Sequence, residues 1–252
     1  MKRKTIVNPR FERLREYVES IPGIFDTEGE TIYHKRNHIK VMTAPDGTVV
    51  NVKRYQVPHG VNRYVYSLGI RKPKGLRAYL YPQRLLDRGI ETPEPIAYIE
   101  ERSNGLLGHS YFVSVQSPYT HTMYELGEAR EGEYEEIAKA FGKFTARMHD
   151  RQVLHLDYSP GNILFDLRPD GTYRFSLVDT NRMYFGPVDM KKGVSAFKRI
   201  WGPKRFFITV VREYARNRGY DADRAEAYAL RERSRFWKRY QRKHKVEFNL
   251  EL

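Results

Sequence analysis

The sequence predicts an α+β protein built from two lobes, and three observations support this class. The chain has 252 residues, enough for two closely packed lobes. Residues 1–116 contain mostly short strand-like segments, whereas residues 117–252 contain longer segments with apolar residues at helical spacing. Polar residues cluster between two apolar runs early in the second part. We therefore expect a small antiparallel sheet with one main helix, followed by a mainly helical lobe.

The first lobe is expected to open with a short helix in residues 9–20, where apolar residues recur at helical spacing. Three strands are expected in residues 31–55, because a Pro-Asp-Gly turn signal at 45–47 interrupts their strand-like pattern. The further elements expected in this lobe are a helix in residues 76–88 and strands in residues 92–100 and 110–116.

The second lobe is expected to contain an amphipathic helix in residues 135–150. Its apolar face would consist of Ile137, Phe141, Phe144 and Met148. A hairpin should follow, with its turn at Arg168-Pro169-Asp170-Gly171. From about residue 188 onward the chain is expected to be helical.

Composition limits the classes of function. The net charge of +14 favours anionic partners such as phosphorylated substrates, acidic membrane surfaces or nucleic acid. The absence of cysteine excludes disulfides, thiolate metal sites and cysteine nucleophiles. No apolar run approaches the roughly 18 residues of a membrane span, and the basic N-terminal stretch has no signal-peptide core. We expect a protein that is soluble or peripheral to a membrane.

The polar cluster has the spacing of a catalytic loop. His155, Asp157 and Asn162 fit H-x-D-x-x-x-x-N, the pattern of the protein-kinase-like fold. The strand after the expected hairpin ends at Asp179, where such kinases place a metal-binding aspartate. Upstream, Lys53 lies in a strand that resembles the one supplying the phosphate-binding lysine.

Phosphoryl transfer explains why these residue types would be needed. Asp157 could orient or deprotonate the acceptor hydroxyl, and Lys53 could bind the phosphates of ATP. Asn162 and Asp179 offer the hard oxygen ligands that Mg²⁺ prefers. Taken alone, Asp179 would also fit a turn cap and Lys53 a solvated strand lysine, and His155 is better explained as a structural hydrogen-bonding residue. Their order along the chain favours the kinase interpretation.

The segments HLDYSPGNILF (155–165) and FSLVDTNRM (175–183) resemble the lipopolysaccharide kinase family. RGIETPEPIAYIE (88–100) and SYFVS (110–114) resemble the first lobe of the same family. The resemblance covers about residues 30–240. It implies a two-lobed kinase fold, ATP with Mg²⁺, and a Kdo or heptose hydroxyl of the lipopolysaccharide inner core as acceptor. It also implies work at the cytoplasmic face of a Gram-negative inner membrane.

Several kinase features are missing. Residues 33–38 contain no glycine where a glycine-rich phosphate loop would lie, and Asp87 is the only acid in residues 54–90 that could pair with the strand lysine. Gln83 or Glu91 would have to substitute. Leu156 replaces the catalytic-loop arginine, Thr180 and Asn181 replace the Phe-Gly of D-F-G, and no A-P-E follows, all of which argues against a protein substrate.

Two other functions remain open at this point. A small-molecule phosphotransferase of the aminoglycoside or choline kinase type would share the fold, but it usually needs an acidic pocket for a cationic acceptor. The high net charge therefore disfavours it. A pseudokinase that acts as an interaction module at a membrane surface is the second alternative, because the helix glutamate is missing. Nucleic-acid binding is not supported by any fold motif.

Two basic features complete the prediction. Residues 231–245 contain eight Lys or Arg and one Glu, interleaved with aromatic residues. They would form either a solvated helix with inward-facing aromatics or a patch that contacts an anionic membrane surface. Arg182 would either bind an anionic group of the substrate or form a structural salt bridge.

Overall fold

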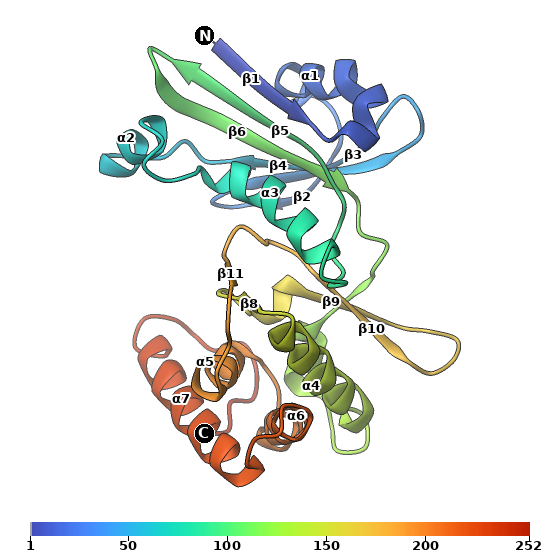
Figure 1. Cartoon of the computed structure of the whole chain (residues 1–252), viewed down its shortest axis with the longest axis vertical. Coiled ribbons are helices and arrows are strands. Elements are labelled where there is room, and N and C mark those ends of the chain that lie inside the picture. Colours follow the sequence, from blue (N-terminus) through green and yellow to red (C-terminus); the bar gives the residue numbers. More distant parts are fainter. Residues whose placement is uncertain (1) are drawn as a thin grey trace. The chain divides into compact units, whose positions relative to one another are not determined.

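The computed structural model describes residues 2–252 and consists of two compact units, one ending at Pro118 and the other beginning at Tyr119 (Figure 1). The elements of the first unit are β1 (Lys2–Val7), the 3-10 helix η1 (Pro9–Leu14), α1 (Arg15–Ile24), β2 (Glu30–His34), β3 (His38–Thr43), β4 (Val49–Tyr55), α2 (Val61–Ser67), α3 (Lys74–Leu86), β5 (Pro95–Ser103) and β6 (Leu106–Val115).

The strands of this first unit form one antiparallel sheet in the order β1-β5-β6-β4-β3-β2. Side chains alternate between its faces. Val50 and Val52 of β4 point into the apolar core beneath α1 and η1, so Lys53 and Tyr55 point to the opposite face. There α3 packs so closely that a Cβ on Gly75 would lie 2.9 Å from the ring of Tyr98. Lys53 therefore belongs to the α3 face of the sheet.

Strand β1 is an edge strand that the sequence analysis does not predict. Its first residues are basic and exposed, so the strand lacks an apolar alternation. Its register on β5 sets Arg3 opposite Glu101 and Lys4 opposite Glu100. Arg3 Nη2 lies 3.1 Å from Glu101 Oε1. Cross-strand charge pairing, which stabilises sheet edges, is a tertiary signal that is absent from the local sequence.

The helices of the first unit differ in detail from the expected ones. The leading helix begins as a 3-10 turn and continues as α1, which contains Pro22. The main helix, α3, begins at Lys74, two residues before the expected start, and contains Pro82 in its interior. A short additional helix, α2, is not predicted because its seven residues carry too little periodicity. The three strands expected in residues 31–55 are confirmed.

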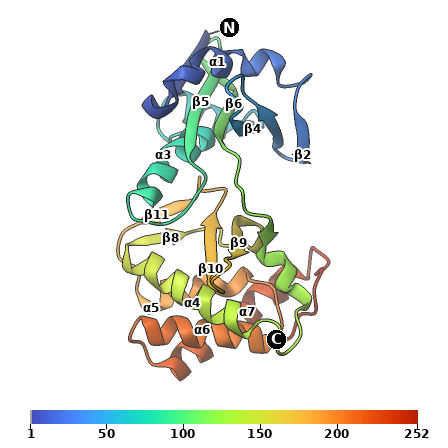
Figure 2. The same cartoon turned by 90° about the vertical axis from the view of Figure 1, so that its right-hand side faces the viewer.

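The second unit is mainly helical and contains short strands around the predicted catalytic loop (Figure 2). Its elements are β7 (His121–Thr122), η2 (Met123–Glu128), α4 (Glu135–Asp150), β8 (Val153–His155), η3 (Pro160–Asn162), β9 (Ile163–Leu167), β10 (Tyr173–Leu177), β11 (Met183–Phe185), α5 (Met190–Ala196), η4 (Phe197–Arg199), α6 (Lys204–Asn217) and α7 (Ala222–Tyr240). The strands pair as β10-β9-β7 and β11-β8.

Helix α4 has the bounds predicted from its periodicity, and the four apolar residues of its predicted face are buried. It packs against α6, which in turn packs against α7. A Cβ on Gly142 would lie 2.7 Å from the carbonyl oxygen of Val210, so α4 and α6 could not approach this closely with a larger residue. Within residues 2–252, no helix combines the length and apolar character needed to cross a membrane.

Candidate active site

The predicted catalytic loop of the second unit connects β8 to β9. Strand β8 pairs with β11, with His155 opposite Met183, and ends at His155. The loop that follows contains Asp157 and closes in the single turn η3, which Pro160 opens and Asn162 ends. The apolar runs that bracket the motif are thus the two strands that fix both ends of the loop.

His155 holds this loop in place through both nitrogens of its side chain. Its imidazole is buried, and Nδ1 accepts a hydrogen bond from the backbone N–H of Asp157 at 3.1 Å. Its Nε2 lies 3.2 Å from the carbonyl oxygen of Val178. Since an N–H can only donate and a carbonyl can only accept, the tautomer protonated at Nε2 satisfies both contacts. Burial lowers the pKa of His155, which favours this neutral form. The contacts support a structural role for His155.

Asn162 connects the loop to the strand that carries the aspartate. Its side-chain Nδ2 donates to the carbonyl oxygen of Asp157 at 2.8 Å, and its own carbonyl accepts from the N–H of Val178 at 3.0 Å. The first bond fixes the orientation of the amide, because only its nitrogen can donate. Among the described residues, nothing donates a hydrogen bond to Asn162 Oδ1. This oxygen is therefore available to a ligand.

Asp179 follows Val178 directly, so its backbone lies beside Asn162. It has a positive φ of 52°, a conformation that aspartate tolerates better than most residues. Its Oδ1 accepts a hydrogen bond from the side-chain amide of Asn181. Asn181 is itself buried, as is Thr180. The two residues that replace Phe-Gly thus turn inward, and Asn181 orients the carboxylate.

Asp157 lies between two arginines. Arg182 Nη1 is 3.2 Å from Asp157 Oδ2, and Arg199 forms an ion pair with Asp157 Oδ1. Arg182 thus forms one of the two contacts predicted for it, a salt bridge. Arg199 is not among the residues predicted from sequence, and no local pattern marks it. Its guanidinium carbon also lies 5.3 Å from the ring centre of Phe236 on α7.

Asp157, Asn162 and the backbone that leads into Asp179 therefore share one hydrogen-bonded frame. Val178 lies at its centre: its N–H bonds to Asn162 and its carbonyl oxygen to His155, whose other nitrogen holds Asp157. The side chain of Asn162 closes the ring by binding the Asp157 carbonyl. This frame lies within one compact unit.

Lys53 lies in the other unit, in the middle of β4, between Ile39 of β3 and Phe112 of β6. It is buried, and its Nζ lies 5.3 Å from the ring centre of Tyr55. The alternative of a solvated strand lysine is therefore wrong. Gln83, one of the suggested substitutes for the kinase glutamate, donates instead to the exposed carboxylate of Asp87 at 2.8 Å.

The chemistry of Asn162 and Asp179 fits Mg²⁺. Both offer hard oxygen atoms, and Mg²⁺ in nucleotide sites is usually held by one or two protein oxygens together with phosphates and water. Within residues 2–252, no group of three or more His, Asp or Glu side chains forms an all-protein metal site. A metal at this position would therefore depend on phosphate oxygens, as it does in kinases.

Comparison with known proteins decides the family. The model of the lipopolysaccharide kinase (Kdo/WaaP) family matches residues 33–185, more than half of the chain. The chain belongs to this family. The resemblance to this family that the sequence analysis described is therefore confirmed. The chain is a kinase. A search of curated protein sequences found no match.

Solved structures support the same fold. WaaP in complex with acyl carrier protein matches with a TM-score of 0.59 and 17% identity, covering 94% of this chain and 98% of that one. WbdD matches with a TM-score of 0.50 and 13% identity, over 81% of this chain and 50% of that chain. The Rio2 kinase from Chaetomium thermophilum matches with a TM-score of 0.49 and 12% identity, over 90% of this chain and 75% of that chain. The WaaP match, which covers nearly the whole of both chains, confirms the predicted protein-kinase-like fold.

Proposed function

We propose that this kinase transfers a phosphoryl group from ATP to a sugar hydroxyl of the lipopolysaccharide inner core, with Kdo as the first candidate and heptose as the second. The observation that supports the proposal most is the frame in which Val178 ties Asp157, Asn162 and the backbone of Asp179 together. Phosphoryl transfer depends mainly on positioning and charge neutralisation, and such a frame supplies the positioning.

Each predicted residue receives one role in this proposal. Asp157 orients the acceptor hydroxyl and accepts its proton. Asn162 Oδ1 and the carboxylate of Asp179 hold Mg²⁺, which when bound neutralises charge on the phosphates. Lys53 binds ATP phosphates, a role that suits a buried ammonium group better than a solvated one. Arg182 binds an anionic group of the acceptor when its contact with Asp157 opens.

The purified chain should release ADP when incubated with ATP, Mg²⁺ and Kdo–lipid A, and mass spectrometry should find one added phosphate on the sugar. A heptose-containing core tests the second candidate in the same assay. Turnover with an aminoglycoside or choline, and none with either lipopolysaccharide acceptor, would contradict the proposal. If Mg-ATP produced neither turnover nor thermal stabilisation, the pseudokinase alternative would be favoured.

We also propose that the C-terminal basic segment contacts an anionic membrane surface, such as the cytoplasmic face of the inner membrane. The segment is exposed and cationic. Two of its aromatic side chains turn inward, as the solvated-helix alternative predicted: Trp237 is buried and Phe236 lies against Arg199, so the cations would make the membrane contact. Its exposed cations are Arg231, Arg235, Lys238, Arg239, Arg242, Lys243 and Lys245. Basic residues near anionic lipid contribute about 1 kcal/mol each.

Vesicle sedimentation measures this contact. The chain should bind vesicles that contain phosphatidylglycerol and lose binding at high salt or on neutral phosphatidylcholine vesicles. The variant Lys238→Gln/Lys243→Gln should bind several-fold more weakly than Lys139→Gln/Lys143→Gln, which removes the same charge from α4. Equal binding by both variants would assign the attraction to net charge alone.

A further inference from the structure

A cavity of about 340 Å³ lies beside the catalytic loop, within the second unit. Its walls come from β8 and the loop after it, from α5, from η4, and from Tyr228 of α7. Four of its lining residues are cationic, namely Lys191, Lys192, Lys198 and Arg199, and none of the described residues that line it is acidic. Such a concentration of one charge in a concave place requires an explanation.

The three lysines of this cavity form no ion pair with any described residue. Within residues 2–252, no carboxylate oxygen lies within 4.0 Å of the ammonium groups of Lys191, Lys192 or Lys198. Lys192 instead lies 5.3 Å from the ring centre of Tyr184. Like charges gathered without a carboxylate repel one another, and a bound anion relieves this repulsion.

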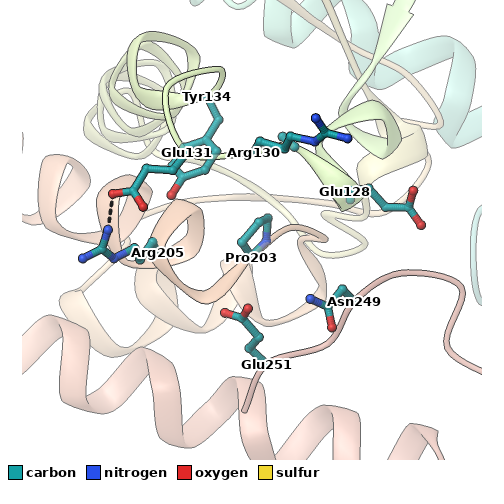
Figure 3. A pocket seen from close by; sticks show the side chains of 10 residues that line it. Glu128, Arg130, Glu131, Tyr134, Pro203, Arg205, Asn249 and Glu251 are labelled. Atoms are coloured by element: carbon teal, nitrogen blue, oxygen red, sulfur yellow. Dashed lines mark hydrogen bonds and ion pairs between the residues drawn. The ribbon is translucent and has the colours of Figure 1, made fainter.

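The high net charge of the chain does not give every cavity of this unit a purely cationic lining. Another cavity of the same unit, shown in Figure 3, contains acidic and basic residues together. There Glu131 forms an ion pair with Arg205, and Glu251 accepts a hydrogen bond from the backbone N–H of Lys204 at 2.9 Å. Acidic and basic residues thus line that cavity together, whereas no acidic residue lines the cavity of Lys191, Lys192 and Lys198 in the described chain.

The lysine cavity adjoins the proposed catalytic base. His155 and Leu156, which directly precede Asp157, line it. Arg199 also lines it and forms the ion pair with Asp157 Oδ1. An anion bound in this cavity could therefore contact Arg199, whose guanidinium also pairs with the carboxylate proposed to orient the acceptor hydroxyl.

We propose that Lys191, Lys192 and Lys198 form a subsite for an anionic substituent of the acceptor, a carboxylate or a phosphate, and that Arg199 connects this subsite to Asp157. The inference rests on the proposed function, because it assigns part of the acceptor site of the same kinase. An acceptor with a negative group near its reacting hydroxyl would be held at two points. Two-point binding orients the hydroxyl, which a single contact cannot do.

Equilibrium binding without ATP tests the subsite separately from catalysis. Calorimetry would measure the dissociation constant of Kdo–lipid A in detergent micelles for the variant Lys191→Gln/Lys198→Gln, which leaves Lys192 on Tyr184. We expect this dissociation constant to rise about tenfold, because the variant loses the binding free energy of two modest charge contacts. The matched control, Lys139→Gln/Lys143→Gln, removes two lysines from the surface of α4 and should change it less than twofold.

Modified acceptors identify the anion. Kdo–lipid A without its phosphates, or with its Kdo carboxylate methylated, should bind equally well to the subsite variant and to the wild type if the missing group is the one that the lysines bind. A loss that is equal in the subsite variant and in the control, or one that persists with both modified acceptors, would overturn the inference.

The two proposals can fail independently. If the subsite variant binds the acceptor more weakly but the wild type releases no ADP, the kinase function fails while the anion subsite stands. If the wild type phosphorylates Kdo–lipid A and the subsite variant binds like the control, the subsite fails while the kinase function stands. Circular dichroism of both variants shows that the chain remains folded.

Discussion

Replacing Asp157 with asparagine should lower kcat for acceptor phosphorylation by about 10²–10⁴-fold, the usual contribution of a general base. Asparagine keeps the shape of the side chain but neither accepts the proton nor carries the charge that pairs with Arg182 and Arg199. The backbone contacts of residue 157 with His155 and Asn162 do not involve the carboxylate, so the loop should keep its conformation. ADP release at saturating ATP and acceptor measures the effect.

The matched control for this prediction is Asp170→Asn. Asp170 carries the same side chain in the exposed turn of the β9–β10 hairpin, where it accepts hydrogen bonds from Thr172 of the same turn. Its replacement should leave kcat unchanged. The Asp157 variant should retain binding of Mg-ATP, because Asn162 and Asp179 remain in place. A variant at Asp157 with kcat near the wild-type value would remove this residue from the proposed mechanism.

The catalytic frame could be predicted because most of it is local in the chain. His155, Asp157 and Asn162 occupy one short loop between two strands, so their spacing alone constrains their geometry. Asp179 could be added because it follows a strand that must pair with the strand after this loop. The hydrogen bonds of Val178 connect the strand that leads to Asp179 with His155 and Asn162, and the sequence pattern does not specify these bonds.

Arg199 could not be predicted, because its contact with Asp157 joins residues 42 positions apart and depends on how η4 packs. The same reason conceals the cavity lysines, which come from α5 and η4. Strand β1 is a third case, since charges on β5 define its partner. Sequence periodicity reports which residues turn inward within one element, but not which distant charge they meet.

The C-terminal basic segment shows how a local pattern can mislead about a single residue. Arg233 belongs to this segment in sequence, yet it is among the most buried large side chains of the described chain. Its Nη1 donates to the carbonyl of Ile200 at 2.6 Å and its Nη2 to that of Gly202 at 2.9 Å. Burial lowers the pKa of Arg233 to about 10, so the guanidinium remains charged at neutral pH.

Replacing Arg233 with alanine should lower the free energy of unfolding by about 3–5 kcal/mol. The change leaves two buried carbonyl groups without donors and opens a cavity beside Phe207, whose ring centre lies 4.7 Å from the guanidinium carbon. Urea denaturation followed by fluorescence and circular dichroism measures the loss. The control is Arg235→Ala on the same helix. The side chain of Arg235 is 61% exposed and pairs with Glu232, so its replacement should lower the free energy of unfolding by less than about 1 kcal/mol.

The effect of Arg233 should extend to the active site because of what it binds. Ile200 directly follows Arg199, so the two hydrogen bonds of Arg233 anchor the segment that carries Arg199 to Asp157. We therefore expect Arg233→Lys, which keeps the charge but satisfies fewer carbonyls, to fold with an intermediate loss of stability and a lower kcat/KM for the acceptor. If Arg233→Ala were no less stable than Arg235→Ala, the guanidinium would not anchor this segment, and its contact with Phe236 and its ion pair with Asp157 would have to position Arg199.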